Sequence, residues 1–332
     1  MAEEILPHIF KLDIPLPKNP LKSLNSYVIK GKDRNLIIDT GMNRKECIKA
    51  MEDGIEDLEL DLEVTDFFIT HMHADHSGLV ARLGTPTSKL YCSQEDAITI
   101  NAGDGFWEAV RVFTQTGGFP REEFSAAVKN HPGYKFRALG EIPFSIVKDK
   151  DVLQVGDYLL TCVKTPGHTR GHMCLYEAKK RLLFAGDHLL RDITPNISLL
   201  SYKVNPLADY LKSLDKVNGY DIELVLPGHR KLFSDYRQRI DELKMHHQSR
   251  AEEVLRILAE EGPQNAYRVA SSMTWDIDCP TFEEFPIPQK WFATGEALAH
   301  LKYLEEKNLI EKKEAGGTYI FSALARPPLV CV

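Results

Sequence analysis

The segment THMHADHSG, residues 70–78, constrains this chain more than any other stretch of its sequence. His71 and His73 lie two positions apart, and side chains at that spacing point to the same side of an extended segment. Asp75 and His76 follow directly, where the chain is expected to turn into a helix, so they can face a second point nearby. Imidazole nitrogens and carboxylate oxygens are the ligands that zinc and similar divalent metals accept. The segment therefore requires a fold that gathers such side chains at one place.

Three later segments supply the same kinds of side chain. They are His168 in TPGH, Asp187 in FAGD and His229 in LPGH, and each follows a β-rich run and is directly preceded by glycine. Glycine allows a sharp turn of the backbone, so each side chain can point into a cleft at the end of its strand. Seven ligands exceed the four that one zinc ion prefers, which favours two metal ions that share a bridging carboxylate at Asp187.

The pattern of apolar runs predicts two domains. Short strands, a helix over 43–53, and more strands up to a last one that ends at His229 favour two packed sheets with helices outside. After residue 232 the sequence becomes helical and then reads as a hairpin around EAGG, which is the element order of a winged-helix domain. The predicted boundaries are 1–232 for the first domain, 233–325 for the winged-helix-like domain and 326–332 for a loose tail.

Residues 95–145 interrupt this pattern with a long segment that is rich in aromatic residues. A compact domain does not need a connection of that length, so the segment is predicted to be an accessory element. It includes a predicted helix near 105–115. Two interpretations stay open: a lid that lines an apolar substrate groove, or a small satellite core that packs on the sandwich.

The motifs T-H-x-H-x-D-H, T-P-G-H, G-D and P-G-H occur here in the order found in metallo-β-lactamase-fold hydrolases, which residues 5–232 resemble. The resemblance implies a mixed α/β fold, the four-layer αβ/βα sandwich, and two divalent metal ions. Asp39, in IIDTG, matches an aspartate that orients ligands through hydrogen bonds. The implied ligands are His71, His73 and His168 for the first metal, Asp75, His76 and His229 for the second, and Asp187 as the bridge.

Together with its helical C-terminal part, the chain resembles the β-lactamase-like protein 2 group. This group includes bacterial relatives, polyketide-releasing thioesterases and a mitochondrial endoribonuclease. The sequence departs from the wider family at Leu79, where many members have a second glycine. True β-lactamases lack an aspartate at the position of Asp187, which argues against lactam hydrolysis. The pattern that binds glutathione in glyoxalase II is not evident.

The resemblance implies a dinuclear hydrolase in which a metal-bridging hydroxide attacks the substrate. Asp75 and Asp187 are the predicted catalytic residues, with Asp75 steering the proton of the nucleophile. Tyr202 and Arg170 are candidate contacts to the substrate. Zinc is the default metal for these ligands, and iron or manganese suits the same set.

Three functions compete on this evidence. The first is hydrolysis of a small carboxyl derivative, a thioester or a lactone, which the aromatic insertion and the acidic surface favour. The second is a metal-dependent phosphodiesterase or endoribonuclease, and the third is a DNA-binding regulator that senses a metal. Residues 232–332 hold 16 Asp and Glu against 12 Lys and Arg, and the chain has a formal net charge of −7. A surface that neutralises phosphates shows the opposite balance, so nucleic acid is not an expected partner.

The expected partner is a small-molecule substrate, and the C-terminal domain is expected to have a structural role or to form a homodimer. The N-terminus has neither the basic nor the long apolar region of a signal peptide. An apolar run of about 18 residues, which a membrane-spanning helix needs, does not occur, so no membrane contact is expected. The scattered cysteines fit free thiols in a reducing cytoplasm.

Overall fold

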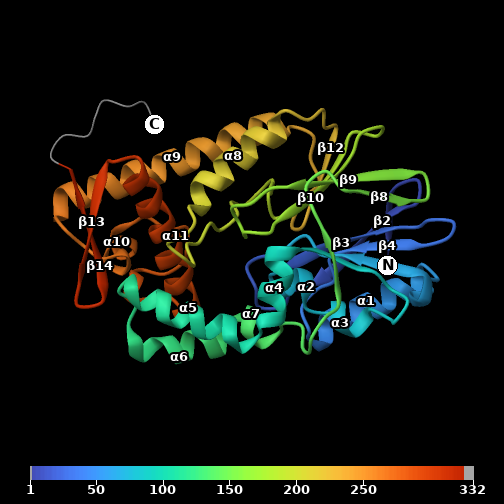
Figure 1. Ribbon diagram of the computed structural model, residues 1–332, viewed down its shortest axis with the longest axis horizontal. Helices are drawn as coiled ribbons and strands as arrows, with labels where there is room; N and C mark the ends of the chain where they lie inside the picture. The colour runs from blue at the N-terminus through green and yellow to red at the C-terminus, as the bar shows by residue number, and fades with distance from the viewer. Residues whose placement is uncertain (1, 325–332) are drawn as a thin grey trace. The chain divides into compact units, whose positions relative to one another are not determined.

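The computed structural model describes residues 2–324, and the contacts within it define two compact units (Figure 1). The first unit consists of the chain up to Gly103, Pro132–Pro195 and Ser213–Arg239. Among the described residues, the second consists of Asp104–His131, Asn196–Lys212 and 240–324. Two segments that precede residue 233 therefore belong to the second unit. The domain boundaries drawn from the sequence stay a prediction, and the tail at 326–332 lies outside the described residues.

The first unit contains two β-sheets. A seven-stranded sheet has the order β1 (Glu3–Leu6), β2 (Ile9–Pro15), β3 (Ser23–Ile29), β4 (Asn35–Ile38), β5 (Thr65–Phe68), β6 (Leu90–Ser93), β7 (Phe144–Val147). A five-stranded sheet has the order β12 (Leu224–Pro227), β11 (Leu182–Gly186), β10 (Met173–Glu177), β9 (Tyr158–Lys164), β8 (Val152–Val155). Strands β4 to β7 pair in parallel with one another in the first sheet, and so do β11 and β12 in the second. Parallel strands end at the same edge of a sheet, so the segments that follow β11 and β12 lie at one edge of the second sheet.

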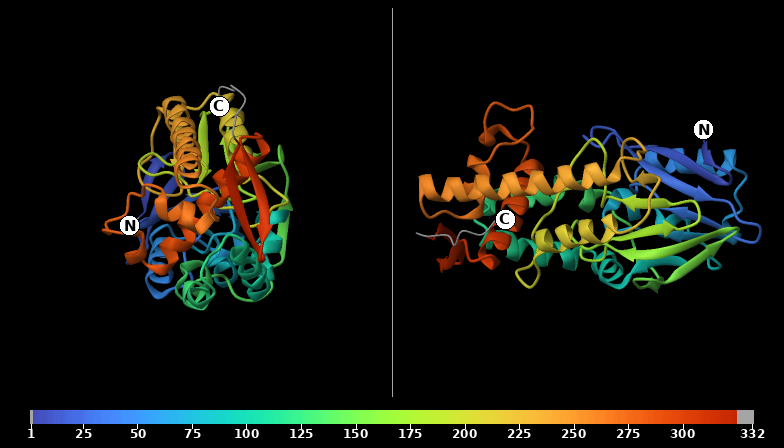
Figure 2. Two further views of the ribbon diagram at one scale, coloured as in Figure 1. Left: turned by 90° about the vertical axis from the view of Figure 1, so that its left-hand side faces the viewer. Right: turned by 90° about the horizontal axis from the view of Figure 1, so that it is seen from above.

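The two sheets enclose a buried core. Side chains alternate between the faces of a strand, and in β4 Leu36 and Ile38 face the core that is shared with Phe184 and Leu226 of the second sheet. Ile37 faces the opposite way, into the core beneath the helices. In Figure 2 the strands of the first sheet are mostly blue and those of the second mostly green, and they form two layers. The predicted mixed α/β fold class is confirmed.

Short helices cover the outer face of the seven-stranded sheet. They are α1 (Lys45–Asp57), the 3₁₀ turn Leu62–Val64, α2 (Ala74–Ser77), α3 (Val80–Leu83), α4 (Gln94–Ala102) and α7 (Pro132–Lys135). Cys47 and Met51 of α1 and Val80 of α3 are buried in the outer core. Among residues 2–324, no helix combines the length and the apolar composition that crossing a bilayer requires.

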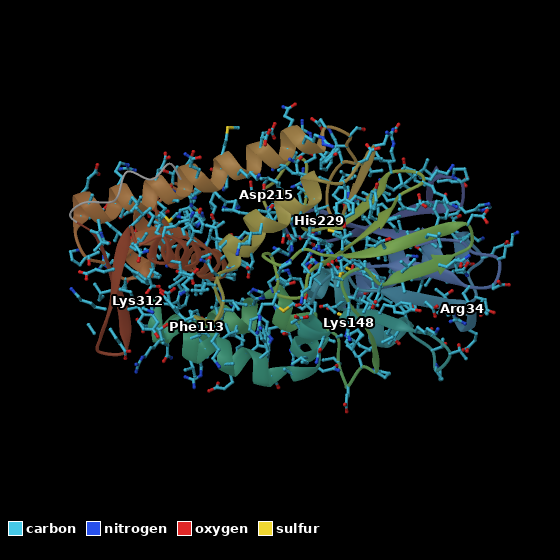
Figure 3. The ribbon with its side chains drawn as sticks, turned by 45° about the horizontal axis from the view of Figure 1, so that its top comes forward. Arg34, Phe113, Lys148, Asp215, His229 and Lys312 are labelled. Carbon is cyan, nitrogen blue, oxygen red and sulfur yellow. The ribbon has the colours of Figure 1, made fainter. Side chains whose placement is uncertain are left out.

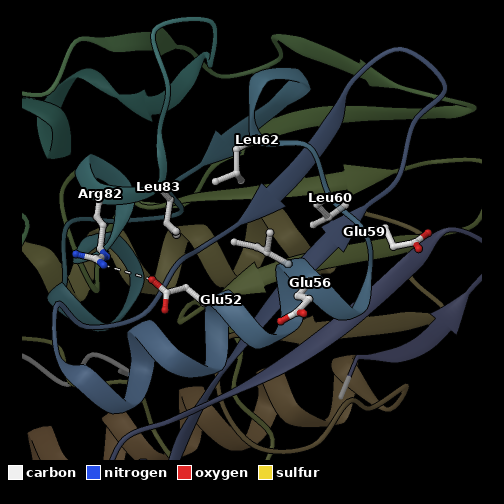
Figure 4. A pocket seen from close by; sticks show the side chains of 8 residues that line it. Glu52, Glu56, Glu59, Leu60, Leu62, Arg82 and Leu83 are labelled. Atoms are coloured by element: carbon white, nitrogen blue, oxygen red, sulfur yellow. Dashed lines mark hydrogen bonds and ion pairs between the residues drawn. The ribbon is translucent and has the colours of Figure 1, made fainter.

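A surface hollow of about 610 Å³ lies over α1 and α3 (Figure 4). Three glutamates of this region, Glu52, Glu56 and Glu59, and several leucines line it, and Arg82 forms an ion pair with Glu52 at 3.3 Å. None of its lining residues belongs to the predicted metal ligands, so the hollow is separate from that chemistry.

The second unit is mainly helical. Its elements include α5 (Asp104–Thr116), α6 (Arg121–Asn130), α10 (Ala266–Ser272), the 3₁₀ turn Phe282–Glu284, α11 (Ile287–Glu306), and the hairpin of β13 (Ile310–Ala315) and β14 (Thr318–Ala323). Helices α8 (Pro206–Asn218) and α9 (Tyr236–Glu261) each have residues in both units. The predicted helical C-terminal region is confirmed.

The middle of the aromatic insertion, Asp104–His131, packs within this second unit, while Phe136 and Phe144 pack against the outer core of the first. Phe119 and Phe124 form a small core with Trp291 of α11, and the Phe124 and Trp291 ring centroids lie 5.1 Å apart. The satellite core that was one of two interpretations therefore exists, and its partner is α11 of the second unit. The sequence does not reveal this packing partner because Trp291 lies more than 150 residues further along the chain. A role as a lid stays a prediction.

Candidate metal centre

All seven predicted ligand residues lie together in the first unit. Their ligand atoms form three overlapping groups, in each of which the atoms lie within 4.8 Å of one another. The groups are His71, His73 and His168; His71, His76 and Asp187; and Asp75, His76 and His229. Because the groups share members, they describe one continuous cluster with two ends.

Strand ends deliver these residues. His71 and His73 follow β5, Asp187 follows β11, and His229 follows β12, where Figure 3 shows it. The backbone N–H of Gly228 donates to the carbonyl of Gly186 at 2.8 Å, which ties the segment before His229 to the segment before Asp187. The parallel pairing of β11 and β12 thus places Asp187 and His229 at one edge of the second sheet.

The first group consists of three imidazoles. Nε2 of His71 lies 3.0 Å from Nδ1 of His73, and the His168 ring centroid lies 4.8 Å from that of His71 and 4.6 Å from that of His73. On the other side of its ring, Nδ1 of His71 lies 3.0 Å from the Thr70 hydroxyl oxygen. When Nδ1 donates to Thr70, Nε2 keeps a lone pair that faces the cluster.

The second group combines imidazoles with a carboxylate. Nε2 of His229 lies 3.4 Å from Oδ2 of Asp75, and Nε2 of His76 lies 4.0 Å from the same oxygen. Nδ1 of His229 lies 2.7 Å from the carbonyl oxygen of Ser23, an acceptor, so this nitrogen donates. In the neutral ring, Nε2 of His229 is therefore the nitrogen with a lone pair, and it faces Asp75.

Asp187 faces both groups. Its Oδ1 lies 3.5 Å from Nε2 of His76 and 3.5 Å from Nε2 of His229, while its Oδ2 lies 3.6 Å from Nε2 of His168. Its backbone N–H donates to Nε2 of His172 at 3.1 Å. One carboxylate therefore spans the cluster, and His172 fixes the backbone that carries it.

Asp39 supports residues of both groups. Its Oδ2 accepts from Nδ1 of His76 at 2.7 Å and from the Thr70 hydroxyl at 2.7 Å, and its Oδ1 accepts from the Thr70 backbone N–H at 2.8 Å. The first bond orients His76 directly, and the second orients His71 through Thr70. Asp39 has a φ of 59°, in the left-handed region that aspartate tolerates better than most residues, and these hydrogen bonds hold it there.

Burial makes His71 and His73, two histidines of the first group, weak bases. Burial, reinforced by the neighbouring histidines, lowers the pKa of His71 well below its usual range. Burial and the adjacent His168 lower the pKa of His73 to about 3. Both rings are therefore neutral at physiological pH, which is the form that binds metals.

In the second group, neighbouring carboxylates raise the pKa values of the histidines. Burial alone would lower the pKa of His76, but Asp39 and Asp187 raise it well above its usual range. Burial likewise opposes protonation of His229, whose pKa Asp187 and Asp75 nevertheless raise. Conversely, His229 and His76 hold the pKa of Asp187 well below its usual range, although burial would raise it. A metal ion that binds here has to displace protons.

The buried atoms of the cluster fit cations. Among the described residues, Nε2 of His76, Nε2 of His229 and Oδ1 of Asp187 are buried and have no hydrogen-bond partner. Leaving buried polar atoms without a partner costs free energy, on the order of 1–3 kcal/mol each, and these three face one another. The donor set of nitrogens and carboxylate oxygens satisfies this need when divalent ions bind. The residues present therefore fit two metal ions.

Gly228 has a role other than the expected one. We expected the glycine before His229 to permit a sharp turn. Instead, a methyl group at this position would lie 2.7 Å from Oδ1 of Asp187 and 2.7 Å from Cε1 of His76. The residue is glycine because any side chain would occupy the space of the ligands.

The two candidate substrate contacts lie in different units. Arg170 is exposed in the segment after His168, in the first unit. Tyr202 belongs to the second unit, where its ring lies 5.9 Å from that of Phe113 and 3.6 Å from Nζ of Lys312; Phe113 and Lys312 are labelled in Figure 3. A role of either residue in substrate binding stays a prediction.

With the fold and the cluster described, the comparison with known families is decisive. The model of the Metallo-beta-lactamase superfamily matches residues 20–229, which is more than half of the chain. The chain belongs to this superfamily, as its motifs predicted, and it is a hydrolase of the metal-dependent kind.

Known proteins extend this similarity beyond the first domain. The probable metallo-hydrolase YqjP of Bacillus subtilis (strain 168) is 25% identical over 317 residues, which cover 90% of this chain and 93% of that protein. The human protein named acyl-coenzyme A thioesterase MBLAC2 is 26% identical over 228 residues, covering 64% of this chain and 75% of its own. A crystal structure of a metallo-beta-lactamase family protein from Thermus thermophilus has a TM-score of 0.80 and 28% identity, covering 97% of this chain and 100% of that one.

Proposed function

We propose that this protein is a dinuclear metal-dependent hydrolase of small carboxyl derivatives, and that acyl thioesters are its substrates, with lactones as the second class. The observation that carries the dinuclear proposal is Asp187, whose two oxygens face different ligand groups. Support for the thioester comes from the human relative, which is named as an acyl-coenzyme A thioesterase.

Two divalent ions, proposed to be zinc with iron or manganese as alternatives, would polarise the acyl carbonyl and lower the pKa of water toward neutrality. The neutral rings of His71 and His73, together with His168, would hold one ion at one end of the site. Asp75 at the other end and Asp187 between the ends would offset the positive charge of the ions. This difference in charge between the two ends would orient an incoming carbonyl relative to the attacking water.

The proposed reaction consumes one water per thioester. The oxygen of water forms a bond to the acyl carbon, and the carbon–sulfur bond breaks. One proton of water ends on the departing sulfur, so the products are a carboxylic acid and a thiol. Asp75, which lies beside His229 at the second end, is proposed to accept a hydrogen bond from the attacking water and to steer its proton.

The test is thiol release from a panel of acyl thioesters by the zinc-loaded protein. Asp187→Ala serves as the blank, and Arg82→Ala, in the separate hollow, serves as the matched control. We expect turnover by the wild type and by Arg82→Ala and none by Asp187→Ala. Absence of thiol release from every thioester overturns the thioesterase proposal, and cleavage of phosphodiesters in its place supports the alternative activity.

We also infer that the C-terminal elements form a winged-helix module, because helices α9, α10 and α11 precede the β13–β14 hairpin. We propose a structural or dimer-forming role for it, since acidic residues outnumber basic ones in 232–332. Light scattering would show a dimer. Salt-dependent binding of RNA or DNA would contradict the proposed role.

A further inference from the structure

Asp96 is a buried carboxylate next to the metal cluster that the motifs do not include. It lies in the first turn of α4 and is 1% exposed. Acidic residues are common in the first turn of a helix because they interact with its dipole, but such residues normally face solvent. The capping role at this terminus belongs to Ser93, whose hydroxyl accepts from the Asp96 backbone N–H at 3.3 Å. The carboxylate of Asp96 is therefore not the N-terminal cap of this helix.

That side chain binds two separate ligand-bearing segments. Oδ2 of Asp96 accepts from the backbone N–H of Met72 at 3.0 Å and from the hydroxyl of Thr169 at 2.6 Å. Oδ1 accepts from the backbone N–H of Gly171 at 3.0 Å. Met72 lies between the ligands of the first segment, and Thr169 directly follows the ligand of the second.

The ligands that directly adjoin the residues bound by Asp96 are those of the first group. His71 and His73 flank Met72, and His168 precedes Thr169. The segment around His229 receives its own support from Ser23 and from Gly186, and neither of these contacts involves Asp96. The carboxylate thus links the three imidazoles of one group across nearly a hundred residues of sequence.

Close packing at Gly171 shows that this contact is built into the fold. A methyl group at Gly171 would lie 2.1 Å from the Ser93 hydroxyl oxygen and 2.7 Å from Cγ of Asp96. Only glycine lets the segment after His168 approach the start of α4 closely enough for its N–H to reach the carboxylate.

We propose that Asp96 is a positioning residue that sets the distance between the His71–His73 segment and the His168 segment, and so preforms the three-imidazole group for one metal ion. This inference rests on the proposed function insofar as the three histidines bind a metal. Three charge-assisted hydrogen bonds from two segments fix their relative position more strongly than neutral bonds would. Partners that orient ligands in this way typically change metal affinity about 10–100-fold.

The experiment titrates full-length metal-free protein with Co²⁺, followed by the visible absorption of the bound ion and by calorimetry. The variants are Asp96→Ala and the milder Asp96→Asn, which keeps one acceptor oxygen. The control is Asp66→Asn: Asp66 is also a largely buried carboxylate of the first unit, and it pairs with Arg34 at 2.6 Å. Melting temperature is measured for each variant.

We expect Asp96→Ala to weaken the first-group site about 10–100-fold and to change its absorption spectrum, while the other site stays within about twofold of wild type. Asp96→Asn is expected to show a smaller loss at the same site, and it decides the question if Asp96→Ala does not fold. Asp66→Asn is expected to lower the melting temperature and to leave both affinities unchanged.

Two results overturn the inference. One is unchanged affinity at both sites in Asp96→Asn and Asp96→Ala with only a lower melting temperature, which would make Asp96 a residue of the fold alone. The other is a wild type that binds no Co²⁺ at this group. If the wild type binds two ions but hydrolyses no thioester, the substrate proposal fails while the role of Asp96 stands.

Discussion

The two groups of candidate ligands both face the carboxylate of Asp187, yet the chain builds them by different means. In the first group, burial keeps His71 and His73 neutral, and the segments that carry the imidazoles are joined by side-chain contacts. In the second group, carboxylates raise the pKa values of the histidines, and His229 is oriented by a backbone carbonyl. The comparison teaches that one end is ready to bind a metal at neutral pH, while the other must first lose protons.

Removal of the shared carboxylate of Asp187 is expected to disrupt both ligand groups at once. Asp187→Ala leaves Nε2 of His168, His76 and His229 without the oxygen that each now faces. We expect kcat/KM for the best thioester to fall at least about a thousand-fold, which corresponds to about 4 kcal/mol. The measurement is initial rates after reconstitution with zinc. A loss of less than tenfold would contradict the bridging role.

Removal of one histidine at a time, from either group, tests the two proposed metal sites separately. His168→Ala is expected to lose the ion of the first group, and His229→Ala that of the second. Each variant should retain about one equivalent of metal where the wild type holds two. Elemental analysis after dialysis measures this content. If either variant retains both ions or loses both, the division into two groups is wrong.

Asp39 touches both groups, so its substitution tests whether they are coupled. Asp39→Asn removes the negative charge that Nδ1 of His76 and the Thr70 hydroxyl now contact. We expect a loss of about 10–100-fold in affinity at both ends, in contrast to the one-sided loss expected for Asp96. Competition with a chelator of known affinity provides the measurement, and a loss at one end alone would count against the coupling.

The smallest effect is expected for a substitution that lies outside both ligand groups. Arg82→Ala removes an ion pair whose partners, Arg82 and Glu52, are each 55% exposed. Exposed pairs contribute between about 0 and 1 kcal/mol, so the free energy of unfolding should change by less than about 1 kcal/mol and activity should not change. Urea unfolding checks the first value. An inactive Arg82→Ala would show that the hollow communicates with the metal cluster.

The sequence allowed the ligand cluster to be predicted because metal chemistry restricts residue types and spacings so strongly. His71, His73, Asp75 and His76 stand out in one segment, and the remaining ligands repeat the pattern of a glycine after a strand. Asp96 could not be found in this way. From the sequence it is an ordinary acidic residue that follows a helix-capping serine, and only the folded chain shows which backbone groups its carboxylate reaches.

Element boundaries and packing partners were also beyond the sequence. The run VTDFFIT predicts a strand through Thr70, but β5 ends at Phe68. Asp39 accepts both hydrogen bonds that Thr70 donates, while the carbonyl of Thr70 accepts from the backbone N–H of Met173 in β10 at 2.9 Å, so this residue has left the pairing of its own sheet. The aromatic composition of the insertion likewise drew attention to residues such as Phe119 and Phe124, but their own segment does not indicate that Trp291 is the packing partner.

The space beside Gly228 has a consequence for laboratory evolution of this enzyme. A residue with no functional group occupies a place where every larger side chain would displace Asp187 or His76. A saturation library at this position should therefore return inactive clones almost without exception, as if glycine took part in the reaction. Randomisation aimed at new substrates is better directed at exposed residues such as Arg170, where added volume meets solvent and the inorganic centre keeps its geometry.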